Sequence, residues 1–402
     1  MHLFINASGA NAGGGITYLR NVLPCLAAEP GVRATVLVSP AVRGQFSESS
    51  NIRLLELPES RLGTFGRFLR EQSLVPQLIR DCGADVLLST GNFAILRSPV
   101  PQILLSRNAL YTSRDFSRDL VRRGEFHLWT DTKIRGRLAK YSINRADCTV
   151  APSQAFADEL EGWTGRPVRV VHHGFDREVF SSDREPLAPD LQRALERSPG
   201  VLRLLLVSHY NYYRNFETVF RAVGLIRERI GRGVQLVLTC KLEGSPGGYS
   251  TRRAVALVRQ LGIERELLQL GAVPYGQLQH LYRSSDVYVT AAYAETFAHP
   301  LVEAMSCGLP IVASDLPVHR EICRDAAVYF PPFSPDELAD RVAQVVLSPT
   351  ARETLGHCGF SRTNDFSWRR HVEEILEIAR ELTGVVVQAP AFEPRKARVA
   401  HR

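Results

Sequence analysis

Two glutamates, Glu295 and Glu303, flank the start of an apolar stretch in the segment AETFAHPLVEAMSCGLPIVAS. Pro300 suits the first turn of a helix and Gly308 the position just past its end, so we expect a helix from about His299 to Ser306. A glutamate in the first helical turn often only balances the helix dipole. Here, however, free amides that can bind a phosphate lie between two carboxylates that can accept sugar or ribose hydroxyls. The spacing therefore favours a site for a sugar, a diphosphate and a ribose.

A second candidate lies in VSHYNYYRNFETVF, which follows a strand-like run. Asn215 is predicted to cap the next helix, and Arg214 would project toward that helix start, where a guanidinium can bind a diphosphate through two hydrogen bonds. The simpler alternative is a solvated arginine.

A glycine-rich turn, NASGANAGGGITYLRN, follows the first strand-like run. Its glycines allow the backbone to approach a ligand closely, and the relevant positions are Gly13, Gly14 and Gly15. The turn is not G-x-G-x-x-G and no P-loop lysine follows it, so dinucleotide binding and NTP hydrolysis are disfavoured.

These candidate residues all follow short β-type runs that alternate with helical stretches, the pattern of βαβ units on parallel sheets. Ligands bind at the carboxyl edge of such sheets. The polar, proline-bearing stretch 175–200 interrupts the alternation and is the expected connection between domains. We predict an α/β chain with two Rossmann-like parallel-sheet domains, at residues 1–180 and 195–365, that face each other across a cleft. An amphipathic helix at about 366–385 and a poorly ordered tail at 386–402 should follow.

The composition is that of a globular protein, with 45% apolar and 23% charged residues over 402 positions. No apolar run approaches the roughly 20 residues needed to cross a bilayer, and the N-terminus lacks the basic leader and apolar region of a signal peptide. The seven cysteines are spaced singly, so we expect reduced, mostly buried residues and not a metal site. These features predict a cytoplasmic protein.

The stretch from Arg97 to Arg145 carries eleven basic and four acidic residues, a local excess of +7. The aromatic residues Phe116, Phe126, Trp129 and Tyr141 are interspersed among them. This combination suits a surface that meets a phosphorylated lipid, so peripheral contact with the inner face of an anionic membrane is predicted. The alternative is a solvated helical face. No motif of a nucleic-acid-binding protein is present, so nucleic acid is not expected as a partner.

The segment around Glu295 and Glu303 resembles the family 4 glycosyltransferases, whose hallmark is a pair of glutamates separated by seven residues. Further segments resemble that family in the same order, namely ADCTVAPSQAFADEL, VRVVHHGFDREVF, GAVPYGQLQHLYRSSDVYV, ASDLPVHREICRDAAVYFPPFSPDELADRV and FSWRRHVEEILEIA. The resemblance implies the GT-B architecture: two Rossmann-like domains, a nucleotide-sugar on the C-terminal domain, and a final helix that crosses back to the N-terminal domain.

The resemblance assigns most of the candidate residues to the nucleotide-sugar. It implies that Glu295 binds hydroxyls of the donor sugar and Glu303 the ribose, with the amides of Phe297 and Ala298 near the sugar and the diphosphate. The family normally places an arginine and then a lysine on the diphosphate. Here His209 stands at the first of these positions and Arg214 at the second. The remaining donor-binding residues implied in this way are His209, Arg214, Val273 and His299.

The acceptor side of the cleft follows from the same resemblance. The glycine loop from Gly13 to Gly15 would lie across from the donor phosphates and near the acceptor, with Arg107 beside it. Where the family often has a histidine near the reaction centre, this chain has Arg107 and Asn108. Glu295, Arg214 and Asn108 are the expected catalytic residues.

The function implied is retaining transfer of a sugar from a UDP- or GDP-linked donor to a hydroxyl of a glycan or a lipid-linked acceptor. Because the chain has no D-x-D pair to hold a divalent ion against a diphosphate, neither a metal nor another cofactor is expected. The alternative is a non-catalytic nucleotide-sugar-binding subunit of a glycan assembly pathway. A glycosidase is disfavoured because one acid would occupy the ribose position, and an NAD-dependent oxidoreductase because its glycine fingerprint is missing.

Overall fold

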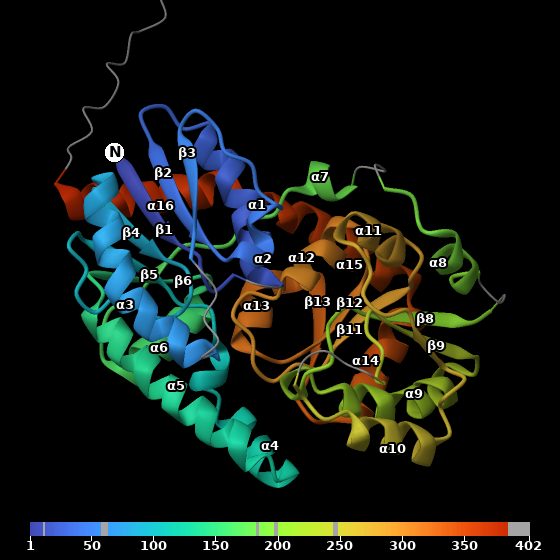
Figure 1. Cartoon of the computed structure of the whole chain (residues 1–402). Coiled ribbons are helices and arrows are strands. Elements are labelled where there is room, and N and C mark those ends of the chain that lie inside the picture. The colour runs from blue at the N-terminus through green and yellow to red at the C-terminus, as the bar shows by residue number, and fades with distance from the viewer. Residues whose placement is uncertain (11–12, 58–62, 182–184, 197–199, 244–247, 385–402) are drawn as a thin grey trace, which may run out of the picture.

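The computed structural model describes residues 1–10, 13–57, 63–181, 185–196, 200–243 and 248–384. Within them the chain forms two α/β domains that lie side by side, each built on one parallel sheet (Figure 1). Both faces of each sheet are buried: Phe4 lies in a different apolar cluster from its neighbours Leu3 and Ile5, and Leu205 lies in a different one from Leu204. The predicted architecture of two Rossmann-like parallel-sheet domains is confirmed. The predicted tail at 386–402 lies outside the described residues.

The first sheet has the strand order β3-β2-β1-β4-β5-β6-β7, and every described pair is parallel. Its strands are β1 (His2–Asn6), β2 (Arg33–Val38), β3 (Ile52–Glu56), β4 (Val86–Ser89), β5 (Gln102–Leu105), β6 (Cys148–Ala151) and β7 (Arg169–Val170). The helices of this part are α1 (Gly14–Ala27), α2 (Pro40–Arg43), α3 (Gly63–Cys82), η1 (Ala109–Tyr111), α4 (Arg114–Arg123), α5 (Phe126–Arg145) and α6 (Gln154–Thr164). The strand order reverses between β1 and β4, which opens a crevice at their carboxyl ends.

The second sheet has the order β10-β9-β8-β11-β12-β13, again parallel in every described pair. Its strands are β8 (Leu202–Leu206), β9 (Val234–Leu238), β10 (Leu267–Gln269), β11 (Val287–Thr290), β12 (Ile311–Ser314) and β13 (Ala327–Phe330). Its helices are η2 (Tyr212–Arg214), α9 (Phe216–Ile230), α10 (Arg252–Leu261), α11 (Tyr275–Arg283), α12 (His299–Ser306), α13 (Pro317–Cys323), η3 (Arg324–Ala326), α14 (Pro335–Leu347) and α15 (Pro349–Arg362). Here the order reverses between β8 and β11.

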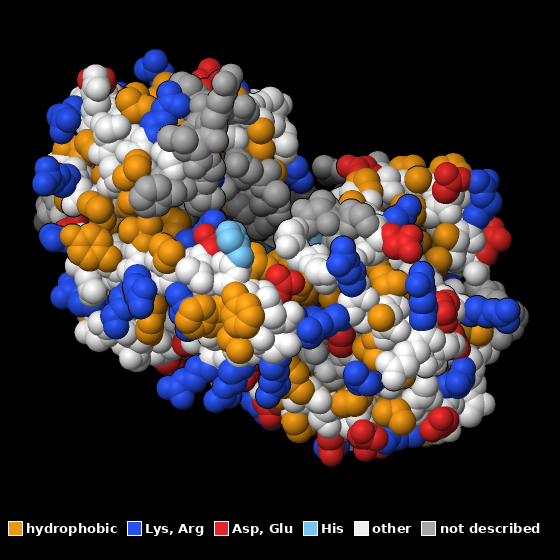
Figure 2. All heavy atoms as spheres, turned by 60° about the horizontal axis from the view of Figure 1, so that its bottom comes forward, with side chains coloured by type: hydrophobic (Ala, Val, Ile, Leu, Met, Phe, Trp, Pro, Cys, Tyr) orange, Lys and Arg blue, Asp and Glu red, His pale blue; other side chains and the backbone are white. Residues whose placement is uncertain are grey.

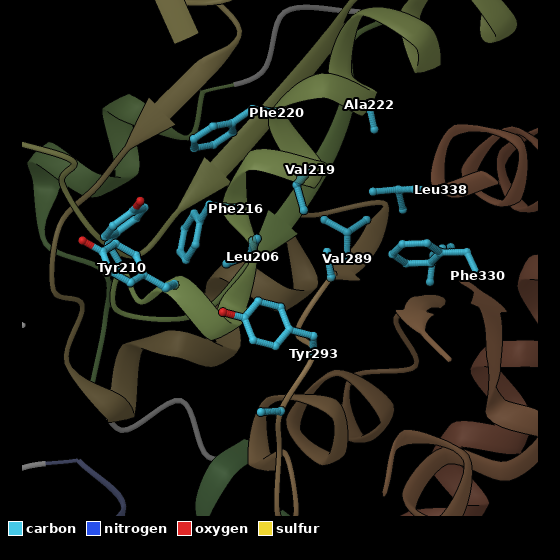
Figure 3. Close-up of a cluster of buried hydrophobic side chains, with 14 of the residues drawn as sticks. Leu206, Tyr210, Phe216, Val219, Phe220, Ala222, Val289, Tyr293, Phe330 and Leu338 are labelled. Atoms are coloured by element: carbon cyan, nitrogen blue, oxygen red, sulfur yellow. The ribbon is translucent and has the colours of Figure 1, made fainter. Parts of the chain in front are cut away.

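The strands of the second sheet are near-continuous apolar runs in the sequence because both of their faces are buried. All five residues of β8 are buried, because helices cover both faces of a parallel sheet. Figure 3 shows Val219 of α9 and Leu338 of α14 directed toward Val289 of β11 and Phe330 of β13. This packing fixes the strands whose carboxyl ends carry the candidate residues.

Helix α16 (Trp368–Thr383) follows the second domain in the chain but packs on the first (Figure 1). Its apolar stripe, which includes Val372, Ile375 and Leu376, belongs to the same buried cluster as Leu3 of β1. The helix starts at Ser367, whose hydroxyl accepts a hydrogen bond from the amide of Arg370. The two domains are therefore joined by a second crossing in addition to the stretch 175–200.

That stretch is less irregular than the sequence predicts. It contains two short helices, α7 (Arg177–Ser181) and α8 (Pro189–Ala194), although residues 182–184 and 197–199 lie outside the described part. Phe175 and Phe180 are buried in an apolar cluster of the second domain. The connection is thus anchored by its aromatic side chains.

The cysteines differ from expectation in one respect. All seven are free thiols, but only Cys240 and Cys323 are buried and the other five are half-buried. The prediction that most are buried was wrong, because several lie on helices at the edge of the core and not on its inner face.

Gly174 offers a test of how closely α16 must approach the first domain. A Cβ atom added at Gly174 would lie 2.0 Å from the amide nitrogen of Trp368. We expect Gly174→Ala to lower the free energy of unfolding by about 3 kcal/mol, because the backbone of α16 must move away. Denaturant unfolding followed by circular dichroism measures this change.

The matched control is Gly162→Ala, at an exposed site within α6 where an added Cβ meets nothing within 4 Å. Since alanine is the better helix former, this substitution should stabilise the protein by up to about 1 kcal/mol. Equal effects of the two substitutions would contradict the close approach described for α16.

Candidate active site

A cavity of about 580 Å³ lies where the carboxyl ends of the two sheets face each other. Loops from both domains line it, and they follow strands β1, β4, β5 and β7 on one side and β8, β9, β10 and β11 on the other. Both reversals of strand order therefore open into the same space, which is the usual position of ligands in open parallel sheets. Of the predicted site residues, the following line this cavity: Gly13, Gly14, Gly15, Arg107, His209, Arg214, Val273, Glu295, Phe297, Ala298, His299 and Glu303.

The start of α12 lies at the centre of the second domain's side of the cavity. The predicted bounds of this helix, His299–Ser306, are those observed. Pro300 occupies the first turn, and Ala298 precedes the helix with a left-handed backbone (φ 64°) that alanine adopts only at a cost of about 1 kcal/mol. This turn directs the chain from the β11 loop into the helix so that the free amides of its first turn face the cavity.

Glu295 and Arg214 form a direct ion pair, which the sequence did not predict. The Arg214 guanidinium donates to the Glu295 carboxylate, and their side chains are 20% and 11% exposed. Burial alone would lower the pKa of Arg214, but the neighbouring Glu295 carboxylate raises it above its ordinary value. The arginine therefore stays charged, and the pair joins the loop after β8 to the loop after β11.

Glu303 lies in the second turn of α12, and its predicted place in the first turn was wrong. It is the fifth residue of α12 and so belongs to its second turn, where it is buried and accepts a hydrogen bond of 2.7 Å from the hydroxyl of Tyr282. Burial raises its pKa from 4.5 to about 7, although the Tyr282 hydrogen bond acts in the opposite direction. The Glu303 carboxyl therefore titrates near neutral pH.

Arg107 lies on the opposite wall, beside the glycine loop. Its guanidinium donates to the carbonyl oxygens of Gly14 (3.3 Å) and Thr90 (2.8 Å), and it lies 5.0 Å from the centre of the Tyr18 ring. Burial lowers the pKa of Arg107, which the neighbouring Tyr18 partly offsets. The prediction that Arg107 and the glycines share one part of the cavity is met by these contacts.

Asn108 does not reach the cavity. Its side chain turns away to cap η1, where its Oδ1 accepts a hydrogen bond from the amide of Leu110 (3.0 Å). The sequence predicted Asn108 as a catalytic residue and placed Arg107 beside the glycine loop, but the Asn108 side chain is used to cap η1. The structure therefore brings only Arg107 of this pair to the site.

Asn215 precedes α9 as predicted but does not cap it through its side chain. Its backbone is left-handed (φ 53°), and its Oδ1 accepts instead from the Thr218 hydroxyl (2.9 Å). The left-handed turn lets η2 end at Arg214 before α9 begins. His209 is exposed at the rim of the same loop, so its imidazole is available to a ligand.

Three histidines form a cluster behind the start of α12, and the sequence did not predict that they lie together. His173 and His299 stack with ring centres 5.2 Å apart, and their facing nitrogens lie 3.1 Å apart. His371 of α16 packs against His173 and hydrogen-bonds the Tyr18 hydroxyl (3.0 Å). Burial lowers the pKa of His299 and His371 to about 4 and holds that of His173 well below its ordinary value. These rings are neutral at physiological pH and join α1, α12 and α16.

Several further residues that line the cavity had no sequence signal of their own. They carry hydroxyl or amide groups, and they include Thr17, Asn92, Tyr213, Thr239, Tyr275 and Thr296. Asn92, Thr239 and Thr296 lie in loops that follow strands, and this position could have identified them, because each loop at the carboxyl edge of a parallel sheet contributes to the crevice.

The loop that carries Glu295 is also held from the first domain. The hydroxyl of Ser153 donates to the carbonyl oxygen of Thr296 (2.7 Å). Glu321 of α13 accepts from the amides of Gln154 (2.8 Å) and Ala155 (2.7 Å) at the start of α6. Burial would raise the pKa of Glu321, but these hydrogen bonds and one with His172 lower it below its ordinary value. The two domains thus meet through directed polar contacts beside the cavity.

Comparison with known families agrees with this geometry. Residues 12–179 match the family model described as Glycosyltransferase Family 4, and residues 189–361 match the one described as Glycosyl transferases group 1. The chain belongs to the group 1, family 4 glycosyltransferases. The two matches divide at the connection 180–188, so each model corresponds to one sheet of this glycosyltransferase.

Individual relatives are distant. A D-inositol 3-phosphate glycosyltransferase of Corynebacterium jeikeium is 26% identical over 253 residues, which are 60% of this chain and 58% of the relative. The match thus spans about three fifths of the relative's length.

Solved structures show the fold of the whole chain. Sucrose-phosphate synthase from Thermosynechococcus elongatus aligns with a TM-score of 0.76 at 18% identity, over 96% of this chain and all of that one. Anabaena HepE in complex with UDP-glucose aligns with a TM-score of 0.70, also at 18% identity, over 95% of this chain and all of that one. The GT-B fold implied by the sequence is therefore confirmed.

The buried ion pair can be tested by a double-mutant cycle. Glu295→Gln should lower the free energy of unfolding by about 3 kcal/mol, because it leaves the buried Arg214 cation without its carboxylate. Arg214→Gln should have a similar effect, whereas the double variant should recover most of the loss. Urea unfolding of the four proteins measures the coupling, and additive losses would contradict a direct pair.

The raised pKa of Glu303 predicts how stability depends on pH. The folded protein holds a proton on Glu303 that the unfolded chain releases above its ordinary pKa of 4.5, so wild type should lose stability relative to Glu303→Gln as the pH rises from 4.5 to about 7. Glu303→Gln should not show this loss, and Tyr282→Phe should extend it to higher pH because it removes a hydrogen bond to the carboxylate. Unfolding free energies measured across this pH range test the prediction. Parallel curves of unfolding free energy against pH for wild type and Glu303→Gln would contradict the raised pKa of a buried Glu303 carboxyl.

Proposed function

We propose that the chain is a retaining glycosyltransferase that moves a sugar from a UDP- or GDP-linked donor to a hydroxyl of a glycan or a lipid-linked acceptor. The observation that carries this proposal is the single cavity in which Glu295, Glu303 and the amides at the start of α12 lie between two facing parallel sheets. Glu295 would accept hydroxyls of the donor sugar and Glu303 those of the ribose. The amides between them would bind the diphosphate.

Positive charge on both walls suits a departing diphosphate. Arg107 is held by backbone carbonyls and not by a carboxylate, so its charge is available to an anionic ligand. Arg214 is already paired with Glu295, so a bound diphosphate would share this arginine with the carboxylate. These cations and the helix amides would stabilise the leaving group without a divalent metal.

The proposed reaction is a displacement on one face of the sugar. The bond from the anomeric carbon to the diphosphate oxygen breaks, and a bond to the acceptor oxygen forms on the same face. The acceptor proton passes to an oxygen of the leaving diphosphate, so no side chain need act as a nucleophile. Glu295 would stabilise the positive charge that develops on the sugar. The contacts between the domains would exclude water during transfer.

The relatives suggest which substrates to try first. Several of them are D-inositol 3-phosphate glycosyltransferases, and Anabaena HepE was crystallised with UDP-glucose. UDP-glucose and inositol phosphates are therefore the first donor and acceptors for a screen that also includes GDP-sugars and lipid-linked glycans. A donor present at 100 times its dissociation constant should stabilise the protein by about 2.7 kcal/mol in a thermal-shift measurement.

Glu295→Gln separates binding from catalysis. We expect this variant to retain the thermal shift caused by the free nucleoside diphosphate but to lose at least about 100-fold in sugar transfer, because the amide no longer stabilises the developing charge. The matched control is Glu228→Gln, an exposed acid on α9 that does not line the cavity. Transfer is measured by nucleotide release and product formation, with and without a chelator.

The outcomes distinguish the alternatives. Donor binding without any transfer in wild type would support a non-catalytic nucleotide-sugar-binding subunit. Transfer abolished by the chelator would contradict the proposed metal independence, and an inverted anomeric configuration in the product would contradict the retaining reaction. Full transfer by Glu295→Gln would remove this glutamate from the catalytic role.

A further inference from the structure

Helices α4 and α5 expose an unusual number of apolar side chains. Among the described residues, nine large apolar side chains are exposed, and four of these lie between positions 121 and 141. They are Val121, Phe126, Ile134 and Tyr141, with exposed fractions of 47%, 62%, 55% and 44%. Such a concentration on one part of a surface marks an interaction site more often than scattered single residues do.

The exposed residues of α5 follow the helical repeat. Phe126, Ile134 and Tyr141 are eight and seven positions apart, so they lie along one side of the helix. The opposite side is committed to the core, where Ala139 and Ile143 are buried. The exposed stripe is therefore not explained by packing within the described chain.

Cations share this stripe. Six exposed basic residues lie on α4 and α5, namely Arg114, Arg118, Arg122, Lys133, Arg137 and Arg145. Figure 2 brings the lower side of Figure 1 forward, and in it Lys and Arg side chains gather with hydrophobic ones on the lobe formed by the first domain. We call these six cations and the four apolar side chains the basic apolar face.

The acids of α4 and α5, and Glu125 just before α5, each have a partner. Asp115 pairs with Arg118, which is itself one of the six cations, and Asp131 pairs with Arg135. Asp119 pairs with Arg123 (2.9 Å) and also accepts from the Tyr293 hydroxyl of the second domain (2.8 Å). Glu125 accepts from the hydroxyl of Tyr212, likewise in the second domain (2.6 Å). The basic apolar face therefore keeps a net positive charge.

We propose that the basic apolar face binds the surface of an anionic lipid bilayer, with α5 lying in the plane of the interface. Phe126, Ile134 and Tyr141 would enter the boundary between headgroups and acyl chains, while Lys133 and Arg137 contact lipid phosphates. Charge alone would fit any polyanion, but exposed aliphatic side chains in the same stripe favour lipid over nucleic acid. No helix in the described part of the chain is long and apolar enough to span a bilayer, so the contact is peripheral. The proposal needs no catalytic step and is independent of the proposed function.

Co-sedimentation with vesicles tests the proposal. The full chain is mixed with vesicles of phosphatidylcholine alone or of phosphatidylcholine with phosphatidylglycerol, at low and high salt. We expect binding to the anionic vesicles only, weakened by salt because the exposed cations are screened. Lys133→Glu/Arg137→Glu and, separately, Phe126→Ser/Ile134→Ser should each lower the partition coefficient at least about tenfold.

The control variant carries the same types of substitution elsewhere. Leu347→Ser/Arg232→Glu removes one exposed apolar side chain and reverses one exposed cation on the second domain, and it should bind like wild type. Circular dichroism confirms that all variants are folded. Absence of binding by wild type, equal binding to neutral vesicles, or an equal loss in the control would overturn the proposal. Loss through the charge variant with no effect of Phe126→Ser/Ile134→Ser would indicate a general polyanion surface and would also overturn it.

Discussion

Every described strand of both sheets runs parallel to its neighbours, and this constraint determines where chemistry can occur. A parallel sheet sends all of its strand ends to one edge, so its loops converge there regardless of their distance in sequence. The two sheets turn these edges toward each other, which brings Gly14, Arg107, Arg214 and Glu295 to one cavity. Helices on both faces bury the strands and fix their ends. Site residues are thus positioned by the core, and the loops need only be short.

The charges in the cavity suit the proposed anionic ligand. A buried charge is costly unless it is compensated, and Arg214 and Glu295 compensate each other. Burial raises the pKa of Glu303 to about 7, and the histidines behind α12 are uncharged at physiological pH. Among the described residues that line the cavity, this leaves Arg107 and the amides at the start of α12 as the uncompensated positive elements. A diphosphate would supply the negative charge that these groups lack in the free protein.

The sequence was informative wherever one local rule decided the outcome. Strand and helix periodicity predicted two parallel-sheet domains, and Pro300 with Gly308 predicted the bounds of α12. It failed where tertiary contacts decide. Nothing local states that Asn108 turns away to cap η1, or that Arg214 and Glu295, which are 81 positions apart, form a pair. Likewise, a histidine cluster drawn from three separate elements has no signature in sequence spacing.

The loop after β11 both lines the cavity and contacts the first domain. Tyr293 donates to Asp119 of α4, and Thr296 accepts from Ser153, so the first domain holds this loop at two points on either side of Glu295. Glu295 is therefore positioned from both domains at once: by Arg214 from the second and by these two contacts from the first. If the domains separated, the two contacts from the first domain would break and only those from the second domain would hold the loop. The contact between the domains and the geometry of the Glu295 carboxylate are for this reason not independent.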